Sequence, residues 1–210
     1  MKATDFNLKE EITFQPDKGL VINRDTRLLL FDSNAMGLIF YGMIEKLGLE
    51  ATSQIFIQSG FEHGFSDFIA MKAVYGDKFD SEVDLFASGP VIHSWEGLVN
   101  AQPTKIEIDR KSGHFICEGI WRNSWQAEQY LTFNPIGSKA VCSSLIGYAA
   151  GWTTGFMNKP VAAIETSCTA KGDPHCGWLL KPVSEFGKEA EFELAVLKKQ
   201  FEKFEYSKSI

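Results

Sequence analysis

The sequence predicts an α+β fold in which helices are mixed with antiparallel hairpins. Short β-rich segments are joined by turn residues, and the longer segments between them begin and end at helix-capping residues. The chain has 210 residues, of which 44% are hydrophobic, so it is large enough to bury one core.

The N-terminal part is expected to begin with a hairpin over residues 12–22, whose turn lies at 15–19. A helix then follows from a cap at Asp32 or Ser33, and Gly48 is expected to end it.

Two further helices are predicted before the central strands. One covers residues 50–75. The other is capped by Ser88 and starts at Gly89-Pro90, because Pro is favoured in the first turn of a helix. His93 lies on the first turns of that helix.

The central segment predicts two strands, at 104–108 and 114–121, joined by a turn at 109–113. Side chains alternate between the faces of a strand. One face of the second strand therefore carries Phe115, Cys117, Gly119 and Trp121.

A short helix at 124–133 precedes an uncharged segment at 140–158 that approaches the length of a membrane span. Its Ser, Thr and Gly residues make its hydrophobicity modest, so we expect a buried helix of a water-soluble protein. Its glycines share one face, which lets another backbone approach closely, at Gly147, Gly151 and Gly155.

The most specific chemical pattern lies in the last third of the chain. Glu165 and three of the four cysteines, Cys142, Cys168 and Cys176, form a candidate set of metal ligands. The segment 171–175 predicts a turn that brings Cys168 and Cys176 together. Three thiolates and a carboxylate in a closed tetrahedron suit a structural zinc ion, whereas a catalytic zinc ion needs an open position.

The residues alone leave alternatives open. The spacing is not that of a C-x2-C zinc finger, and cysteines often serve as small buried hydrophobic residues. His175 can replace Glu165 as the fourth ligand. Cys117 is expected to be a packed strand residue.

His93 and Trp121 are candidates for ligand binding. A neutral imidazole donates or accepts a hydrogen bond and an indole N–H donates one, so the pair can hold one polar atom of an otherwise apolar ligand. Both residue types are also common in ordinary cores. The sequence has no hydrolase, zinc-protease or phosphate-loop motif, so we do not expect an enzyme.

The composition limits which partners and which cellular compartment fit the protein. The net charge of -6 and the lack of a Lys/Arg cluster argue against nucleic-acid contact by this domain. The N-terminus carries no targeting pattern, and four cysteines without a signal peptide fit a reducing compartment. We therefore expect a cytoplasmic protein that does not enter a membrane.

From Ser184 the chain becomes rich in Glu and Lys, and apolar residues recur at three- and four-residue steps at Leu194, Leu197, Phe201 and Phe204. This predicts either a helix packed back on the domain or a coiled linker toward a partner or a following domain. We divide the chain into a ligand-binding domain at 1–183 and a helical linker at 184–210.

Several segments together resemble the N-terminal sensory domain of the aromatic-responsive, sigma-54-dependent bacterial transcription activators, which sense phenols, toluene and xylenes. The matching segments span nearly the whole chain and are 12–16, 47–50, 89–97, 119–124, 142–151 and 165–176.

The resemblance implies a vinyl-reductase-like fold and a homodimer in which the N-terminal hairpin takes part. It implies that His93 and Trp121 bind the hydroxyl group of a phenol and that Phe86 forms an aromatic wall. It also implies a structural zinc ion (Zn2+) held by Cys142, Glu165, Cys168 and Cys176.

Gly119 and Ala163 depart from the family pattern, because phenol-sensing relatives tend to carry bulky aromatic residues there. With Ile146, they are expected ligand contacts. The two small residues are expected to enlarge the pocket, so that larger substituted or two-ring phenols bind as well as phenol.

We therefore expect a sensory domain that binds phenol or a related aromatic compound and relieves repression of a sigma-54-dependent activator, whose ATPase domain would follow the linker. The alternative is a stand-alone small-molecule or tetrapyrrole-binding subunit of a vinyl-reductase-like system. A zinc hydrolase is a weaker third option.

Overall fold

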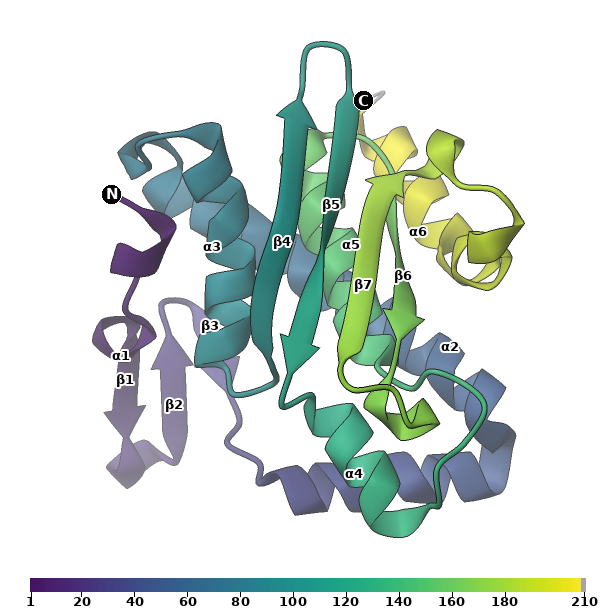
Figure 1. The fold of residues 1–210 in the computed structure, drawn as a ribbon. Helices are drawn as coiled ribbons and strands as arrows, with labels where there is room; N and C mark the ends of the chain where they lie inside the picture. The colour runs from purple at the N-terminus through teal and green to yellow at the C-terminus, as the bar shows by residue number, and fades with distance from the viewer. Residues whose placement is uncertain (209–210) are drawn as a thin grey trace.

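A computed structural model of the protein describes residues 1–208 and has mixed helices and antiparallel sheets, as predicted (Figure 1). The helices are α1 Leu8–Glu11, α2 Ser33–Tyr75, α3 Glu82–Trp95, α4 Trp125–Phe133, α5 Ser143–Met157 and α6 Glu191–Lys208. The strands are β1 Ile12–Gln15, β2 Leu20–Asn23, β3 Thr26–Leu28, β4 Asn100–Asp109, β5 His114–Arg122, β6 Val161–Ser167 and β7 Cys176–Pro182. Short 3-10 helices lie at Ala3–Asp5, Pro16–Lys18, Gly76–Lys78, Thr169–Lys171, Val183–Glu185 and Lys188–Ala190.

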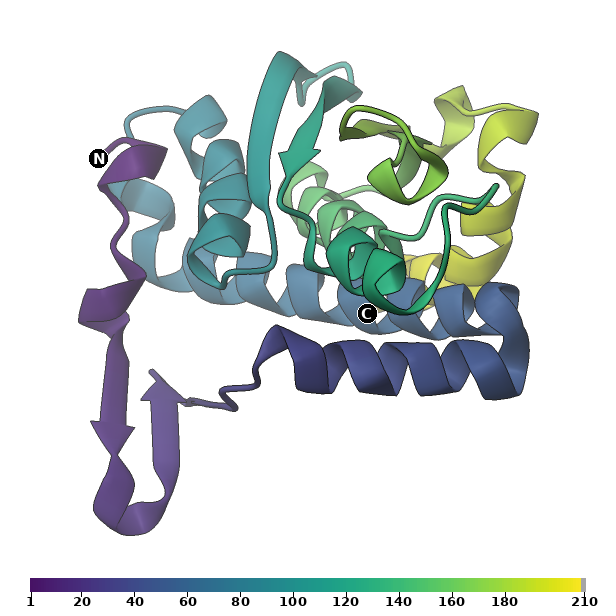
Figure 2. The ribbon, with the colours of Figure 1, turned by 60° about the horizontal axis from the view of Figure 1, so that its bottom comes forward.

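The predicted N-terminal hairpin is present. β1 and β2 pair around a turn that contains Gly19 at a φ of 63°, a left-handed conformation that glycine adopts readily. β3 extends this sheet beside β2. The sheet projects away from the rest of the molecule, and Phe14 on β1 is 61% exposed (Figure 2).

The long helix α2 is bent where the sequence predicts a stop. Asp32 caps its start by accepting a hydrogen bond of 2.8 Å from the backbone N–H of Ala35. Gly48 has non-helical angles, φ 82° and ψ 160°, and the chain reverses direction there (Figure 2). The predicted helices on either side of Gly48 are therefore two segments of α2.

The start of α3 differs from the prediction. The helix begins at Glu82 rather than at Gly89, and Ser81 caps it by accepting a hydrogen bond of 3.1 Å from the N–H of Asp84. Pro90 lies inside the helix instead of in its first turn. The reason is tertiary: the extra turns bury apolar side chains such as Phe86 against the core, which outweighs the local cost of an interior proline.

The larger sheet has the strand order β4-β5-β7-β6, with antiparallel pairing throughout the described strands. The predicted alternation of β5 is confirmed, since Phe115, Cys117, Gly119 and Trp121 are buried. β5 and β7 pair so that Trp121 lies opposite Cys176 and Gly119 lies opposite Trp178. The hairpin formed by β6 and β7 is thereby joined to β5, the strand that carries Trp121.

The predicted close approach at the glycine-striped helix α5 is confirmed, and its partner is α2. A Cβ atom at Gly147 or Gly151 would collide with backbone atoms of α2, and a Cβ at Gly60 or Gly64 of α2 would collide with the backbone of α5. The helices therefore pack almost backbone to backbone. The sheet covers the other side of α5 (Figure 1).

The C-terminal helix α6 packs against α2. The Leu197 side chain is fully buried, and the Phe201 and Phe204 rings lie 5.6 and 5.8 Å from the rings of Phe61 and Phe65. Within this chain the helix therefore follows the first of the two arrangements predicted for it. The division of the chain at Ser184 stays a prediction.

The apolar segment 140–158 forms the buried helix α5 and the loop before it. Across residues 1–208, none of the helices combines the length and the apolar character that a membrane span requires.

Candidate functional site

Most of the predicted site residues gather at two neighbouring places. One is a small cavity between α3, α5 and the inner face of the large sheet, and the other is a cluster of thiols and a carboxylate beside the ends of β6 and β7.

The cavity is aromatic and small. Its volume is about 30 Å3, and its lining includes Phe86, His93, Trp121, Tyr148, Trp152 and Trp178. An engineered cavity of about 150 Å3 holds benzene in another protein. A ring-sized ligand therefore needs these side chains to move apart, so binding here would be accompanied by local rearrangement.

His93 is the polar group of this cavity that the sequence predicts. It is 4% exposed, and its ring stacks on Tyr148 at a centroid distance of 4.0 Å. Burial, reinforced by the nearby charge of His63, lowers the pKa of His93 to about 3. The imidazole is therefore neutral at physiological pH and offers one donor and one acceptor.

Trp121 reaches the same cavity from the sheet. Its side chain is buried, and its ring lies 6.0 Å from that of Trp178, with 30° between the ring planes. Phe86 completes a wall from α3 and contacts Phe115 edge to face at 5.2 Å.

Three other predicted contacts lie elsewhere. Gly119 is beneath Trp178, and Ala163 is on β6 opposite Leu180, one strand away from the cavity lining. Ile146 lines a different cavity, of about 380 Å3, which borders the thiol cluster.

At Gly119 the structure does not show the expected widening of the pocket, and the expectation for Ala163 stays a prediction. A Cβ atom at Gly119 would lie 2.4 Å from the backbone oxygen of Gln102 and 2.5 Å from Cζ2 of Trp178, so the backbone of β4 and the indole together fill the space that the missing side chain leaves. Tyr148, Trp152 and Trp178 also line the cavity, and they are not among the contacts predicted from the sequence. Residue alternation from Cys176 to Trp178 on β7 was the available signal for Trp178.

A polar network connects the cavity wall to the surface. The hydroxyl of Tyr148 donates to Asp67 at 3.0 Å, and His63 lies 3.3 Å from Asp67 and 3.5 Å from Glu96. Burial lowers the pKa of His63, but the hydrogen bond to Glu96 and the charges of Asp67 and Glu96 outweigh it and raise the pKa to about 9. The protonated His63 therefore holds these carboxylates at the back of Tyr148.

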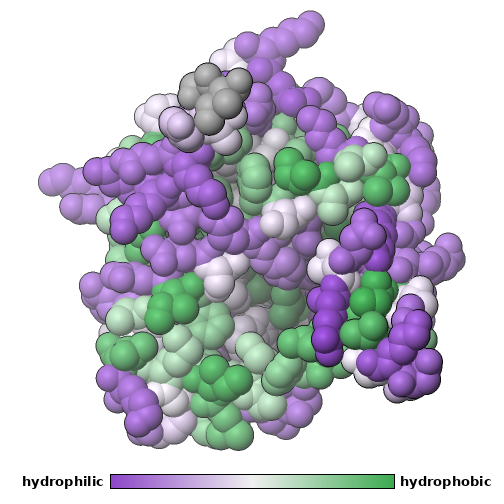
Figure 3. Space-filling model, turned by 180° about the vertical axis from the view of Figure 1, so that it is seen from behind, coloured by the Kyte–Doolittle hydropathy of each residue, from purple (hydrophilic) through white to green (hydrophobic). Residues whose placement is uncertain are grey.

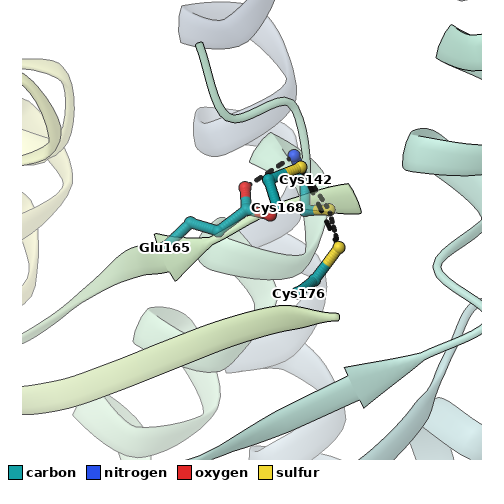
Figure 4. Close-up of side chains that lie close together, drawn as sticks. All are labelled: Cys142, Glu165, Cys168 and Cys176. Carbon is teal, nitrogen blue, oxygen red and sulfur yellow. Dashed lines mark hydrogen bonds between the residues drawn. The ribbon is translucent and has the colours of Figure 1, made fainter. Parts of the chain in front are cut away.

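The thiol cluster has the dimensions of a tetrahedral metal site (Figure 4). The Sγ atom of Cys142 lies 3.5 Å from that of Cys176 and 4.0 Å from that of Cys168, and the remaining sulfur pair is 3.9 Å apart. Four ligands about 2.3 Å from a zinc ion lie about 3.8 Å from one another. One ligand atom from each of the three cysteines and Glu165 falls within 4.8 Å of the others.

Glu165 and His175 were the two candidates for the fourth ligand. Among residues 1–208, Glu165 joins the cluster of thiols and His175 does not. The Oε2 atom of Glu165 accepts a hydrogen bond of 2.9 Å from the N–H of Cys142, while its Oε1 is buried without a partner in the described part of the chain. Burial raises the pKa of Glu165 to about 7 and that of Cys142 well above its ordinary value. A cation at this point would stabilise the charged forms and would give Oε1 a partner, so these residues fit a metal ion.

Backbone groups of the hairpin support the thiols. The N–H of Thr169 donates to the sulfur of Cys176 at 3.4 Å, and the N–H of Cys168 donates to Asp173 at 2.7 Å. Cys117 lies apart from the cluster as a buried strand residue, as predicted.

Comparison with known proteins supports the resemblance found in the sequence. A family model described as "Activator of aromatic catabolism" matches residues 7–109. The chain is 28% identical over 180 residues to "Phenol regulator MopR" of Acinetobacter guillouiae and 25% identical over 187 residues to "Transcriptional regulatory protein XylR" of Pseudomonas putida. The matches cover 86% and 89% of this chain but 32% and 33% of the relatives, so the chain spans about one third of their length.

A solved structure extends the comparison to the fold. The phenol-responsive sensory domain of the transcription activator PoxR, crystallised with phenol, superposes with a TM-score of 0.84 at 27% sequence identity. The match covers 92% of this chain and 94% of that domain.

The fold and these matches define the class: a regulatory sensory domain rather than an enzyme. Within that class, the chain is similar to the aromatic-effector sensory domains of sigma-54-dependent transcription activators, the family that the sequence predicted.

Proposed function

We propose that this domain binds phenol or a related aromatic effector in the cavity beside His93. The observation that carries the proposal is a buried, neutral imidazole that lines an aromatic cavity together with the indole of Trp121. His93 would accept a hydrogen bond from the phenol hydroxyl, and the N–H of Trp121 would donate one to the phenol oxygen. The phenol-related names of two similar proteins, MopR and PoxR, support the choice of effector.

Calorimetric titration of phenol into the wild type, His93→Ala and Trp121→Phe tests this proposal. Each variant loses one hydrogen bond, so phenol affinity should fall about fivefold to tenfold. Toluene lacks the hydroxyl group, and its affinity should change less. Unchanged phenol affinity in both variants would refute the assigned roles.

We further infer that Cys142, Glu165, Cys168 and Cys176 hold one structural zinc ion. Sulfur separations of 3.5 to 4.0 Å and a closed set of four ligands support zinc in a structural role. Such an ion would fix the start of β7, which pairs with the strand that carries Trp121. It would brace the cavity without contacting the effector.

We propose that the domain acts as a homodimer through its N-terminal sheet and the surface next to it. Apolar side chains there are exposed: Leu29 by 67%, Leu30 by 72%, Phe31 by 57% and Leu38 by 58%. Figure 3 shows apolar residues gathered on the lower part of the face seen from behind. Exposed apolar patches of this kind commonly mark protein contacts.

The effector would act by shifting a conformational equilibrium. Because the cavity has to expand to admit a ring, a bound effector stabilises the expanded state. We propose that this change passes through residues 184–210 to an ATPase domain of a cytoplasmic sigma-54-dependent activator and relieves its repression. When the sensory domain and the ATPase domain are expressed as separate proteins, we expect the effector still to bind the sensory domain. The ATPase domain should then no longer respond to the effector.

A further inference from the structure

Trp178 is the cavity residue that the proposed phenol contacts leave without a role. It extends from β7, it is 3% exposed, and it lies directly opposite Gly119 on β5. Its ring edge occupies the place that a side chain at position 119 would need. The lack of a side chain at position 119 therefore leaves room for the indole, between β5 and the backbone of β4 at Gln102.

The indole N–H of Trp178 is buried and has no hydrogen-bond partner. Within residues 1–208, seven buried side-chain nitrogen or oxygen atoms lack a hydrogen-bond partner. Of these seven, Trp178 Nε1 is the one that belongs to a residue lining the cavity beside His93. Buried donors in native proteins are nearly always paired, and an unpaired one is costly. Because Trp178 lines the cavity, an acceptor on a ligand placed beside its indole would give this donor a partner.

We propose that Trp178 is a specificity-determining residue whose N–H donates a hydrogen bond to a second acceptor on the aromatic effector. This inference rests on the proposed function, in which His93 and Trp121 hold the hydroxyl group. The ring centroids of Trp121 and Trp178 lie 6.0 Å apart, and both indoles line the cavity beside His93. One ligand that fills the cavity would therefore contact both indoles.

The ligand class that follows is a monocyclic phenol with a compact acceptor substituent, such as a methoxy, nitro or second hydroxyl group. The bulk of Trp178 fills the room in which a second ring would lie, so the structure favours a polar substituent over a larger apolar one. This replaces the expectation of two-ring phenols that the small residues Gly119 and Ala163 suggested.

Methoxyphenols and ethylphenols provide matched probes, because they have nearly the same shape and differ in the ether oxygen. Calorimetry should compare the 2- and 3-substituted pairs on the wild type and on Trp178→Phe, which keeps an aromatic ring but lacks the N–H. The ratio of ethylphenol Kd to methoxyphenol Kd should fall about fivefold in Trp178→Phe for the better-placed pair. Phenol affinity should change little.

Trp125→Phe is the matched control, because its indole N–H is also buried and unpaired but lies against Phe40 and Phe56, outside the cavity lining. It should leave the ratio unchanged. An unchanged ratio in Trp178→Phe, or an equal loss for phenol and both substituted ligands, would overturn the inference while the proposed function stands. Failure of the wild type to bind any of these phenols would instead overturn the proposed function.

Should Trp178→Phe fold poorly, nuclear magnetic resonance of the wild-type indole N–H groups gives the same answer. The Trp178 signal should move downfield with methoxyphenol relative to ethylphenol. Equal signal positions with both ligands would overturn the inference.

Discussion

Replacing His93 by Asn should remove a large part of the protein's acid sensitivity. The substitution keeps a polar side chain but takes away a group that titrates. In the folded protein burial lowers the pKa of His93 to about 3, whereas an unfolded chain binds a proton on histidine near pH 6.5. Below about pH 6.5 the unfolded state therefore takes up a proton that the folded state does not. The free energy of unfolding consequently decreases as the pH is lowered.

The magnitude follows from the two pKa values. The contribution of His93 is fully present above about pH 6.5 and declines by about 1.4 kcal/mol per pH unit below it, down to about pH 3. Between about pH 7 and about pH 5 the wild type should thus lose about 2 kcal/mol through this residue. Asp67 acts in the opposite direction, because burial raises its pKa to about 6, but it is present in both proteins and cancels in the comparison.

Urea unfolding of the wild type and His93→Asn at about pH 7, 6 and 5 measures the effect. The difference in the free energy of unfolding between the two proteins should shift by about 2 kcal/mol over this range, in favour of the variant at acid pH. Parallel pH profiles would refute the reasoning, since they would mean that His93 is not held neutral by burial.

Three other predictions follow from the packing and the surfaces. Gly151→Ala should lower the free energy of unfolding by about 1–3 kcal/mol, because its Cβ would collide with the backbone of α2. Gly42→Ala should raise the free energy of unfolding by up to about 1 kcal/mol, because its Cβ would meet nothing within 4 Å. Equal urea-unfolding midpoints for the two variants would contradict this packing. Cys176→Ser should abolish stoichiometric zinc in elemental analysis and lower the Tm by about 10 °C, and a variant that keeps both its metal and its Tm would argue against a structural ion. Leu30→Glu should convert a dimer to a monomer in light scattering, while Val83→Glu, equally a charge on an exposed apolar residue, should not; a dimer in both variants would place the interface elsewhere.

Local rules predicted the elements well where local forces decide them. The hairpin turn at Gly19, the break at Gly48 and the alternation of β5 all depend on residues next to one another in the chain. The start of α3 was misplaced because burial of Phe86 extended the helix past a proline that the local rule puts in the first turn. The glycines of α5 predicted a close helix contact, but only the structure identified α2 as the partner, through Gly60 and Gly64.

The candidate site divides in the same way. Residue chemistry by itself determined which groups can act: thiols and a carboxylate for a metal ion, and a histidine and a tryptophan for a hydroxyl group. The size and polarity of the cavity were decided by tertiary structure, because strand register sets Trp178 opposite Gly119 and so turns a missing side chain into a filled space. Which side chain occupies the room beside a glycine depends on contacts between strands far apart in the chain, and no spacing within one strand contains that information.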